Sequence, residues 1–253
     1  MPDQDGINAV RTTFRIVDTL RESDGLIGVS ELAGKLDLPV STVHSHLSTL
    51  HECEYVVKRG TEYGLGYRFL ENGGYQRNQT RLFRYSRPKI DQLADEFGDK
   101  VSLCIPDHGL VTHLYIAKGE EAIETDTFTG VRLHCHSSAA GKAILSQMSE
   151  ERIREIIDRR GLPQNGPNTI TSRDELLAEL QQIEADGYAY DRQERLEGIR
   201  GIAAPLPREG NRPNAAISIE APVSRMSGDR FEKTIPERIQ NISETIRIKL
   251  RYA

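Results

Sequence analysis

The strongest constraint on the fold is a pair of short helical segments separated by a proline-containing turn. Ser30 can cap the first helix. The Asp37-Leu38-Pro39 stretch then forces a turn, because proline disfavours helix in the residue before it. A second helix is expected from about Ser41 to Cys53. The side chains predicted to face inward are Leu32, Ala33, Leu36, Val43, Leu47 and Leu50. The segment therefore resembles a helix-turn-helix unit.

A longer helix is predicted ahead of this pair. Apolar residues recur at helical spacing, and Ser23-Asp24-Gly25 ends the pattern. The predicted buried stripe is Val10, Phe14, Val17 and Leu20, with Thr13 beside it. The three helices would share one small core.

A hairpin is predicted directly after the second short helix. Tyr55–Arg59 forms one strand, Gly60-Thr61 the turn and Glu62–Gly66 the return strand. Lys58 and Arg59 lie beside its tip, where two positive charges can engage a phosphate backbone. The complete unit is a winged helix-turn-helix, and a double-stranded DNA partner follows from it.

The outer face of the second short helix carries short polar side chains that can meet phosphates and base edges in a major groove. The candidate DNA-contacting residues are Arg11, Ser30, Ser41, Thr42, His44, Ser45, His46, Thr49, Lys58 and Arg59. Residues 1–85 hold 10 Lys and Arg against 11 Asp and Glu, so counterion release should contribute modestly. Two wings acting together on a palindrome are expected. A protein-interaction adaptor without DNA contact is the alternative interpretation.

The composition indicates in which cellular compartment the protein is expected. The chain has 253 residues, 37% of them hydrophobic, and no window approaches the roughly 18 consecutive apolar residues of a membrane span. The first residues lack the pattern of a secretory signal, so a cytoplasmic protein without a membrane partner is expected. Cys53, Cys104 and Cys135 are odd in number and far apart, which favours reduced thiols.

A boundary near residue 80 separates this part from a mixed α+β region. Arg68–Gln76 is predicted to be a linker helix with Gly73-Gly74 as a hinge, and Pro88 to lie near the start of the next helix. Strands are predicted at 101–106, 110–117, 123–128, 198–205 and 214–221, with a turn at 208–213. Helices capped by Ser149 and Ser172, which end at Gly161 and Gly187, and a final helix over 229–250 complete the pattern.

Six motifs give the chain a resemblance to IclR-family transcription regulators. They are LPVSTVH at 38–44, LGYRFL at 65–70, AAGKAIL at 139–145, GYAYD at 187–191, GIRGIAAP at 198–205 and AAISI at 215–219. The resemblance implies a winged helix-turn-helix over 1–66, a linker helix over 67–80 and a GAF-like effector domain over 81–253. It also implies a homodimer or dimer of dimers, often a tetramer, acting commonly as a repressor on a palindromic operator. The chain departs from the family at Val40 and Ser45, where relatives often carry basic residues.

A small-molecule effector is expected in the second domain. The helix that begins near Ser137-Ser138 offers unpaired N–H groups to a carboxylate, and small residues leave room there. By resemblance, Asp191, Gly201, Ser218 and Glu220 form the opposite wall. The candidate effector-binding residues are His136, Ser137, Ala139, Ala140, Asp191, Gly201, Ser218 and Glu220.

Relatives that bind short keto acids tend to have a small polar residue in place of Glu220. Glu220 beside Asp191 opposes an anionic ligand unless one acid is protonated or paired, with Arg200 as a possible partner. A hydroxyl-rich or cationic effector, or a metal, is thus favoured. Alternatively, Ser218 and Glu220 lie on a solvent-facing edge strand.

A metal- or redox-responsive regulator is the second functional hypothesis. Cys104, His108, His134 and His136, with His113 and Cys135, could hold Zn²⁺ if the segments met in space. No cofactor is predicted, because His134 and His136 share a strand face from which Cys135 points away. An enzyme is not predicted either, since a complete P-loop and a nucleophile elbow are both missing.

Overall fold

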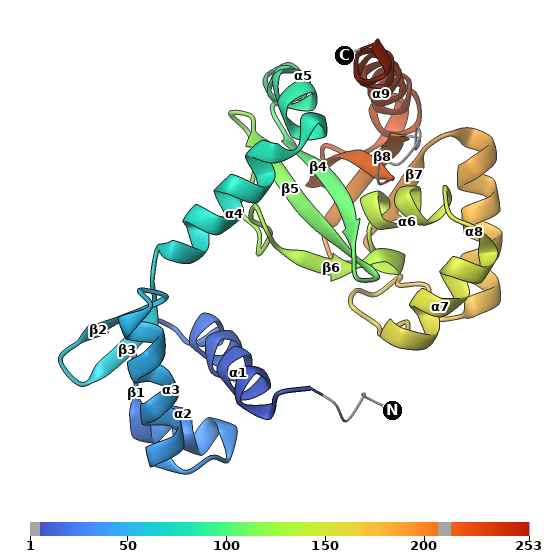
Figure 1. The fold of residues 1–253 in the computed structure, drawn as a ribbon. Helices are drawn as coiled ribbons and strands as arrows, with labels where there is room; N and C mark the ends of the chain where they lie inside the picture. The colour runs from blue at the N-terminus through green and yellow to red at the C-terminus, as the bar shows by residue number, and fades with distance from the viewer. Residues whose placement is uncertain (1–5, 207–213, 253) are drawn as a thin grey trace. The chain divides into compact units, whose positions relative to one another are not determined.

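The computed structural model describes residues 6–206 and 214–252. The turn predicted at 208–213 lies outside these residues. The chain divides into two compact units, with the boundary between Gln76 and Arg77, and each is described by itself. Figure 1 gives the order of the elements along the chain.

The first unit has three helices and a small antiparallel sheet. In chain order the elements are α1 (Asn8–Glu22), β1 (Ile27–Gly28), α2 (Val29–Leu36), α3 (Val40–Glu52), β2 (Val56–Arg59) and β3 (Glu62–Leu65). The strand order is β1-β3-β2, and the β2–β3 hairpin is the wing. All six predicted inward residues of α2 and α3 are buried in one core. The predicted winged helix-turn-helix topology is confirmed.

The buried stripe of α1 differs from the predicted one. Ile16 and Leu20 are the apolar residues that it buries, whereas Val10 and Phe14 are 49% and 59% exposed. Two apolar stripes run along this helix at the same spacing, and spacing alone could not tell which one meets α2 and α3. The first unit therefore carries exposed apolar side chains on α1.

The cap predicted for the first short helix is also misplaced. Gly28 precedes α2 and Pro39 precedes α3, so Ser30 and Ser41 lie inside the first turns and do not cap them. Proline is compatible with this position because its fixed φ suits a helix entry.

The linker helix α4 (Arg68–Gln79) spans the boundary between the units and buries no residue. It runs without a break through Gly73 and Gly74, so the predicted hinge is helical here. The next helix, α5, covers Arg81–Phe97 and holds Pro88 in its interior. Pro88 was expected near the start, because the polar residues before it concealed the first turns of the helix.

The second unit is built on a six-stranded antiparallel sheet with the order β6-β5-β4-β9-β8-β7. The strands are β4 (Lys100–Asp107), β5 (Leu110–Lys118), β6 (Arg132–His134), β7 (Ala189–Arg192), β8 (Ile199–Leu206) and β9 (Ala215–Pro222). The strand predicted at 123–128 does not form. Because β9 lies between β4 and β8, the solvent-facing edge strand considered for Ser218 and Glu220 is excluded.

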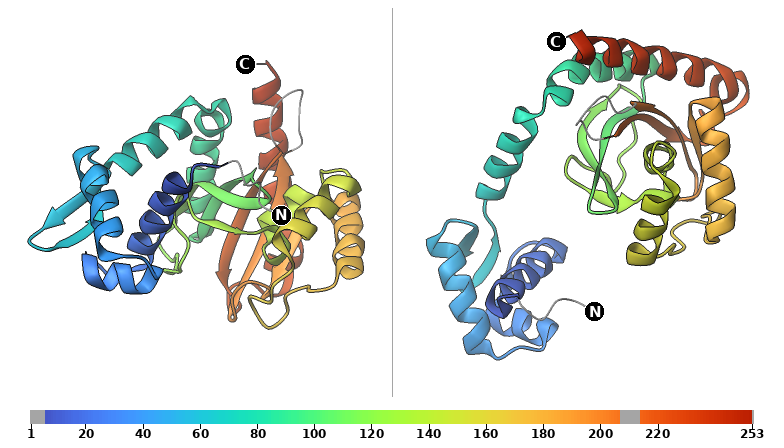
Figure 2. Two further views of the ribbon diagram at one scale, coloured as in Figure 1. Left: turned by 60° about the horizontal axis from the view of Figure 1, so that its bottom comes forward. Right: turned by 45° about the vertical axis from the view of Figure 1, so that its right-hand side comes forward.

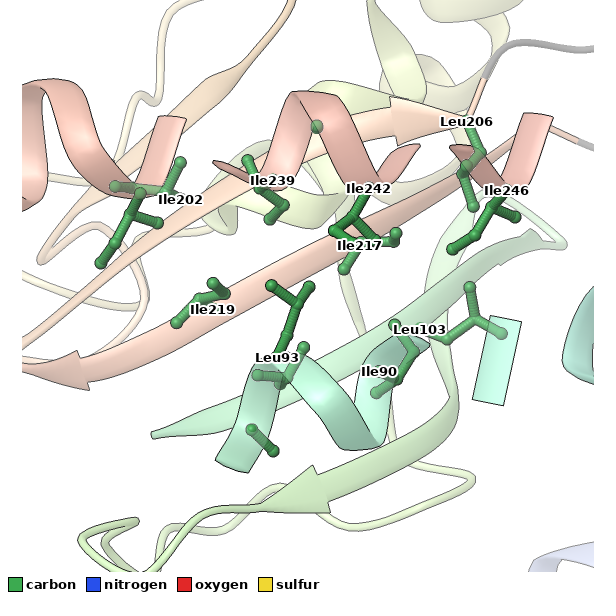
Figure 3. Close-up of a cluster of buried hydrophobic side chains, with 14 of the residues drawn as sticks. Ile90, Leu93, Leu103, Ile202, Leu206, Ile217, Ile219, Ile239, Ile242 and Ile246 are labelled. Carbon is green, nitrogen blue, oxygen red and sulfur yellow. The ribbon is translucent and has the colours of Figure 1, made fainter. Parts of the chain in front are cut away.

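Helices cover both faces of this sheet, which confirms the α+β class. On one face, α5 and the final helix, a π-helical turn at Arg230–Thr234 followed by α9 (Ile235–Tyr252), pack on the isoleucine-rich core of Figure 3. The other face carries the 3₁₀ turn η1 (Cys135–Ser137), α6 (Ala139–Leu145), α7 (Glu150–Arg160) and α8 (Arg173–Asp186). In Figure 2, the curled sheet partly surrounds α6. Ser149 and Ser172 cap α7 and α8 as predicted, and Gly161 and Gly187 end them.

Candidate DNA-binding surface and effector site

The outer face of α3 is polar and open to solvent. Ser41, His44, Ser45 and Thr49 are exposed, and Thr42 is half-buried at the edge of this face. The Ser45 and Thr49 hydroxyls donate to the carbonyl oxygens four residues earlier, at 3.0 and 3.1 Å. Such hydroxyls keep lone pairs free for another donor. Ser48 is exposed on the same face but was missed, although its helical spacing from Ser41 and Ser45 could have identified it.

The basic candidates lie on other elements of the first unit. Lys58 and Arg59 are exposed at the end of β2, next to the turn at Gly60, where φ is +62°. The Lys58 ammonium lies 5.4 Å from the centre of the Tyr63 ring, which supports the stem of its side chain. Arg11 on α1 and Ser30 on α2 are exposed as well.

His46 differs from the rest of the α3 candidates because it turns toward α1. Its Nδ1 lies 2.8 Å from the Thr13 hydroxyl, so this pair ties α1 to α3. The His46 side chain also lines a groove of about 480 Å³ between α1 and α3. The other lining residues are Ala9, Val10, Thr13, Ser45, Thr49, Leu50, Cys53 and Tyr55. The groove adjoins the exposed apolar side chains of α1.

In the second unit, the strand register brings three of the effector candidates into one row. Asp191 on β7 pairs with Gly201 on β8, and Gly201 pairs with Glu220 on β9. Ser218 lies in the adjacent row, opposite Ala203. The neighbours of these residues along the strands belong to the core under α5 and α9, so the two rows face α6.

Glu220 is paired with a residue that the sequence did not suggest. The Lys100 ammonium lies 2.9 Å from Glu220 Oε2, and both side chains are largely buried. Burial opposes ionisation of Glu220, but the charge of Lys100, the hydrogen bond from Lys100 and the other basic groups nearby together outweigh burial and lower the pKa of this acid. The expected partner, Arg200, instead donates to the Met226 carbonyl and stacks on Phe231. It lies on the opposite face of β8, because successive residues of a strand alternate.

Asp191 forms no ion pair with any residue in 6–206 or 214–252. Its Oδ1 accepts the backbone N–H of Glu194 at 2.7 Å. Burial, and then the neighbouring Glu194 carboxylate, raise the pKa of Asp191 to about 7. Glu194 itself pairs at 2.7 Å with Lys142, a fully buried ammonium on α6.

The predicted wall at the start of α6 is engaged with other parts of the protein. The Ser138 side chain caps the helix by accepting the Gly141 N–H. His136 Nε2 lies 3.0 Å from the Pro163 carbonyl oxygen, and the Ser137 hydroxyl accepts a hydrogen bond from Asn165. Ala139 and Ala140 are buried in the core beneath α7 and α8. In the part of the chain that the structure describes, the candidates His136, Ser137, Ala139 and Ala140 therefore share no hydrogen bond with Asp191, Gly201 or Glu220.

The residues proposed as metal ligands do not come together. Among residues 6–206 and 214–252, no group of three or more His, Cys, Asp or Glu side chains could hold an ion. Burial raises the pKa of the Cys104 thiol, and it raises that of Cys135 to about 12, so neither is a thiolate at neutral pH. His108 is exposed and pairs with Asp107, while His134 and His136 contact edge to face. The metal or redox hypothesis gains no support.

Comparison with known proteins finds a matching family domain for each of the two units. Residues 9–60 match the "IclR helix-turn-helix domain", and residues 77–248 match the "Bacterial transcriptional regulator IclR C-terminal" domain. A probable HTH-type transcriptional regulator ArcR of Halobacterium salinarum is 31% identical over 98% of this chain and 95% of its own length. The transcriptional repressor IclR of Escherichia coli K12 is 29% identical over 88% of this chain and 83% of its own.

Two solved structures extend the likeness to the fold. The Thermotoga maritima IclR structure superposes with a TM-score of 0.77 at 26% identity, over 97% of this chain and 99% of that one. An IclR homologue from Microbacterium hydrocarbonoxydans, complexed with 4-hydroxybenzoate, gives 0.78 at 21% identity, over 97% and 100%. No helix of the described residues is long and apolar enough to cross a membrane. Both domain matches and the near full-length relatives show that the chain belongs to the IclR family of transcription regulators.

Proposed function

We propose that the protein is a repressor whose winged helices bind operator DNA in the cytoplasm, and that a small molecule bound in the second unit controls this binding. The observation that carries the proposal is the polar outer face of α3 beside the basic end of β2. The names of its relatives, which include a transcriptional repressor, agree with it.

In this proposal α3 enters the major groove. The exposed Ser41, His44, Ser45 and Thr49 side chains meet base edges or phosphates, with Thr42 at their margin. Lys58, Arg59, Arg11 and Ser30 contact the backbone, and His46 acts indirectly by fixing α3 against α1. Residues 1–76, which make up this unit, hold 7 Lys and Arg against 11 Asp and Glu, so one copy should bind DNA weakly.

A homodimer or a dimer of dimers supplies the second wing. The exposed apolar side chains of Ile7, just before α1, and of Val10 and Phe14 on α1 support this assembly, because a second copy of the same surface would cover them. Closed twofold pairing also matches a palindromic operator.

The effector is proposed to bind over the row that contains Asp191, Gly201 and Glu220, with Ser218 beside it. The buried polar groups gathered there support the assignment, as does the small organic molecule named with the Microbacterium homologue. Control requires the effector to bind one arrangement of the two units better than the other, since equal affinity would shift no equilibrium.

Fluorescence anisotropy on DNA from upstream of the protein's own gene tests the proposal. Thr42→Ala and Arg59→Gln should each weaken binding, the first by loss of a base or phosphate contact and the second by loss of a charge. Arg159→Gln removes an exposed charge from α7 of the second unit and should leave binding unchanged. Absence of binding to this DNA at every salt concentration would contradict a repressor that acts there.

A further inference from the structure

One row of residues crosses four strands of the sheet beneath α6. Lys100 on β4 lies opposite Glu220, and the row continues through Gly201 to Asp191. Across the sheet the row thus places a cation (Lys100), an acid (Glu220), a glycine without a side chain (Gly201) and a second acid (Asp191). The row is buried apart from the partial exposure of Glu220.

The ammonium of this row is already saturated. A lysine has three N–H donors. Lys100 Nζ donates to Thr125 Oγ1 at 2.7 Å, to Thr127 Oγ1, and pairs with Glu220. A ligand carboxylate would have to displace one of these partners. Displacing Glu220 would leave a buried carboxylate without its cation, which is strongly unfavourable.

The two acids of the row flank Gly201. A Cβ at Gly201 would lie 3.4 Å from Glu220 Cγ and 3.5 Å from Asp191 Cβ. Both acidic side chains therefore lie next to the place where a side chain of residue 201 would be. Among the described residues, no side chain forms an ion pair with Asp191, and its Oδ1 accepts the backbone N–H of Glu194. The place above Gly201 is therefore rich in acceptors and poor in donors.

The side chains next to this row are small or polar, and several of their polar atoms lack a hydrogen-bond partner among the described residues. Ser102 lies opposite Ser218 in the adjacent row, and Ala203 follows on β8. The hydroxyls of both serines and Nδ1 of the buried His113 have no hydrogen-bond partner in the described parts of the chain, apart from the contact of Ser218 with the Cys104 thiol. Buried polar atoms are normally satisfied, so these atoms point to a polar ligand.

We propose that the effector places a hydrogen-bond-donating group, an ammonium or a hydroxyl, above Gly201 between Asp191 and Glu220, and that a carboxylate alone is not recognised there. This inference rests on the proposed function, since it names the chemistry of the same effector site. The serine hydroxyls and His113 then bind further polar groups of the ligand.

Saturation-transfer NMR on the full-length protein tests this with butylammonium, butane-1,4-diol and butyrate as separate probes. At least one of the two donor probes should give a signal that falls about tenfold in Gly201→Ala, because the added methyl would crowd the donor out of the space above residue 201. Gly73→Ala on α4, where a Cβ meets nothing within 4 Å, is the matched control and should change no signal. Butyrate should give no signal that depends on Gly201.

Asp191→Asn separates the two kinds of donor, because loss of the charge should weaken butylammonium more than the diol. A butyrate signal that Gly201→Ala removes would overturn the proposal, and so would donor probes whose signals are the same in wild type and Gly201→Ala. Operator binding measured on the same samples keeps the outcomes apart. If DNA binding is normal, a negative NMR result refutes only the ligand class, whereas missing DNA binding refutes the regulator itself.

Discussion

Lys142 shows how a single charge can organise the second unit. Its side chain is fully buried on α6 and pairs with Glu194 at 2.7 Å and Glu179 at 3.0 Å. The backbone N–H of Glu194 in turn donates to Asp191. Because a buried ammonium is unfavourable without such partners, the contacts fix the 191–194 segment against α6.

We expect Lys142→Met to lower the free energy of unfolding by about 3–5 kcal/mol, because it leaves Glu194 buried without a cation. Lys142→Met combined with Glu194→Gln should recover much of this loss, since the amide has no charge and can still accept the Arg192 N–H. Urea unfolding of the single and double variants measures both values. A double variant as unstable as the sum of its single variants would rule out this pairing as the cause.

The raised pKa of Asp191 makes stability depend on pH. The pKa is about 7 in the folded chain against 3.8 for an ordinary aspartate. Between these values the folded state binds a proton that the unfolded state has lost, so stability falls as pH rises through this range and stays low above it. Asp191→Asn should therefore gain Tm relative to wild type from about pH 5 to pH 8.

Thermal unfolding across this pH range checks the expectation. Glu197→Gln alters an exposed acid of the adjoining loop and should track wild type throughout. A Tm difference between Asp191→Asn and wild type that does not change with pH would show that Asp191 titrates normally.

The sequence identified three residues of the row formed by Lys100, Glu220, Gly201 and Asp191 and missed the fourth for a physical reason. The resemblance pointed to Asp191, Gly201 and Glu220, which the register brings together. Lys100 was missed because a lysine at the start of a strand is ordinary until the pairing of β4 with β9, far apart in sequence, is known. Arg200 was accordingly named as the possible partner of Glu220, in place of Lys100.

Among the elements, those marked by local chemistry were predicted best. The serine caps of α7 and α8, the glycines after them and the wing turn all reflect interactions within a few residues. The 123–128 strand failed because its alternating pattern serves another contact, in which Thr125 and Thr127 hydrogen-bond to Lys100. The predicted stripe of α1 is right at Val17 and Leu20 but wrong at Val10 and Phe14, because tertiary packing buries Ile16 instead.

The proposed contribution of the wing to DNA affinity can be measured most directly. Lys58→Gln with Arg59→Gln removes both charges from β2 without disturbing the core, as both side chains are exposed. If each meets one phosphate, the slope of log affinity against log salt should become shallower by about 2. Anisotropy titrations at several salt concentrations give the slope, and Arg159→Gln, which removes one exposed charge outside the wing, should leave the slope unchanged. An unchanged slope would place the wing away from the backbone.

For the whole molecule, the main question is how two units with separate cores act as one regulator. The only described element that crosses their boundary is α4, which buries no residue of its own. The net charge of −5 adds no general attraction to DNA. In the proposed dimer, the additional affinity would come from coupling two copies, and a bound effector would control DNA binding by changing that coupling.

Phe14→Ser tests the coupling at this scale. The Phe14 side chain is 59% exposed on α1, so the change should leave the fold of one copy intact but weaken a surface shared between two copies. We expect about tenfold weaker binding to the full palindrome and unchanged binding to a single half-site, because only the palindrome requires paired wings. Phe128→Ser, at the same exposure in the second unit, should bind both DNAs as wild type does. Equal losses on half-site and palindrome would instead indicate that Phe14 supports the reading unit itself, and no loss on either would mean that another surface pairs the wings.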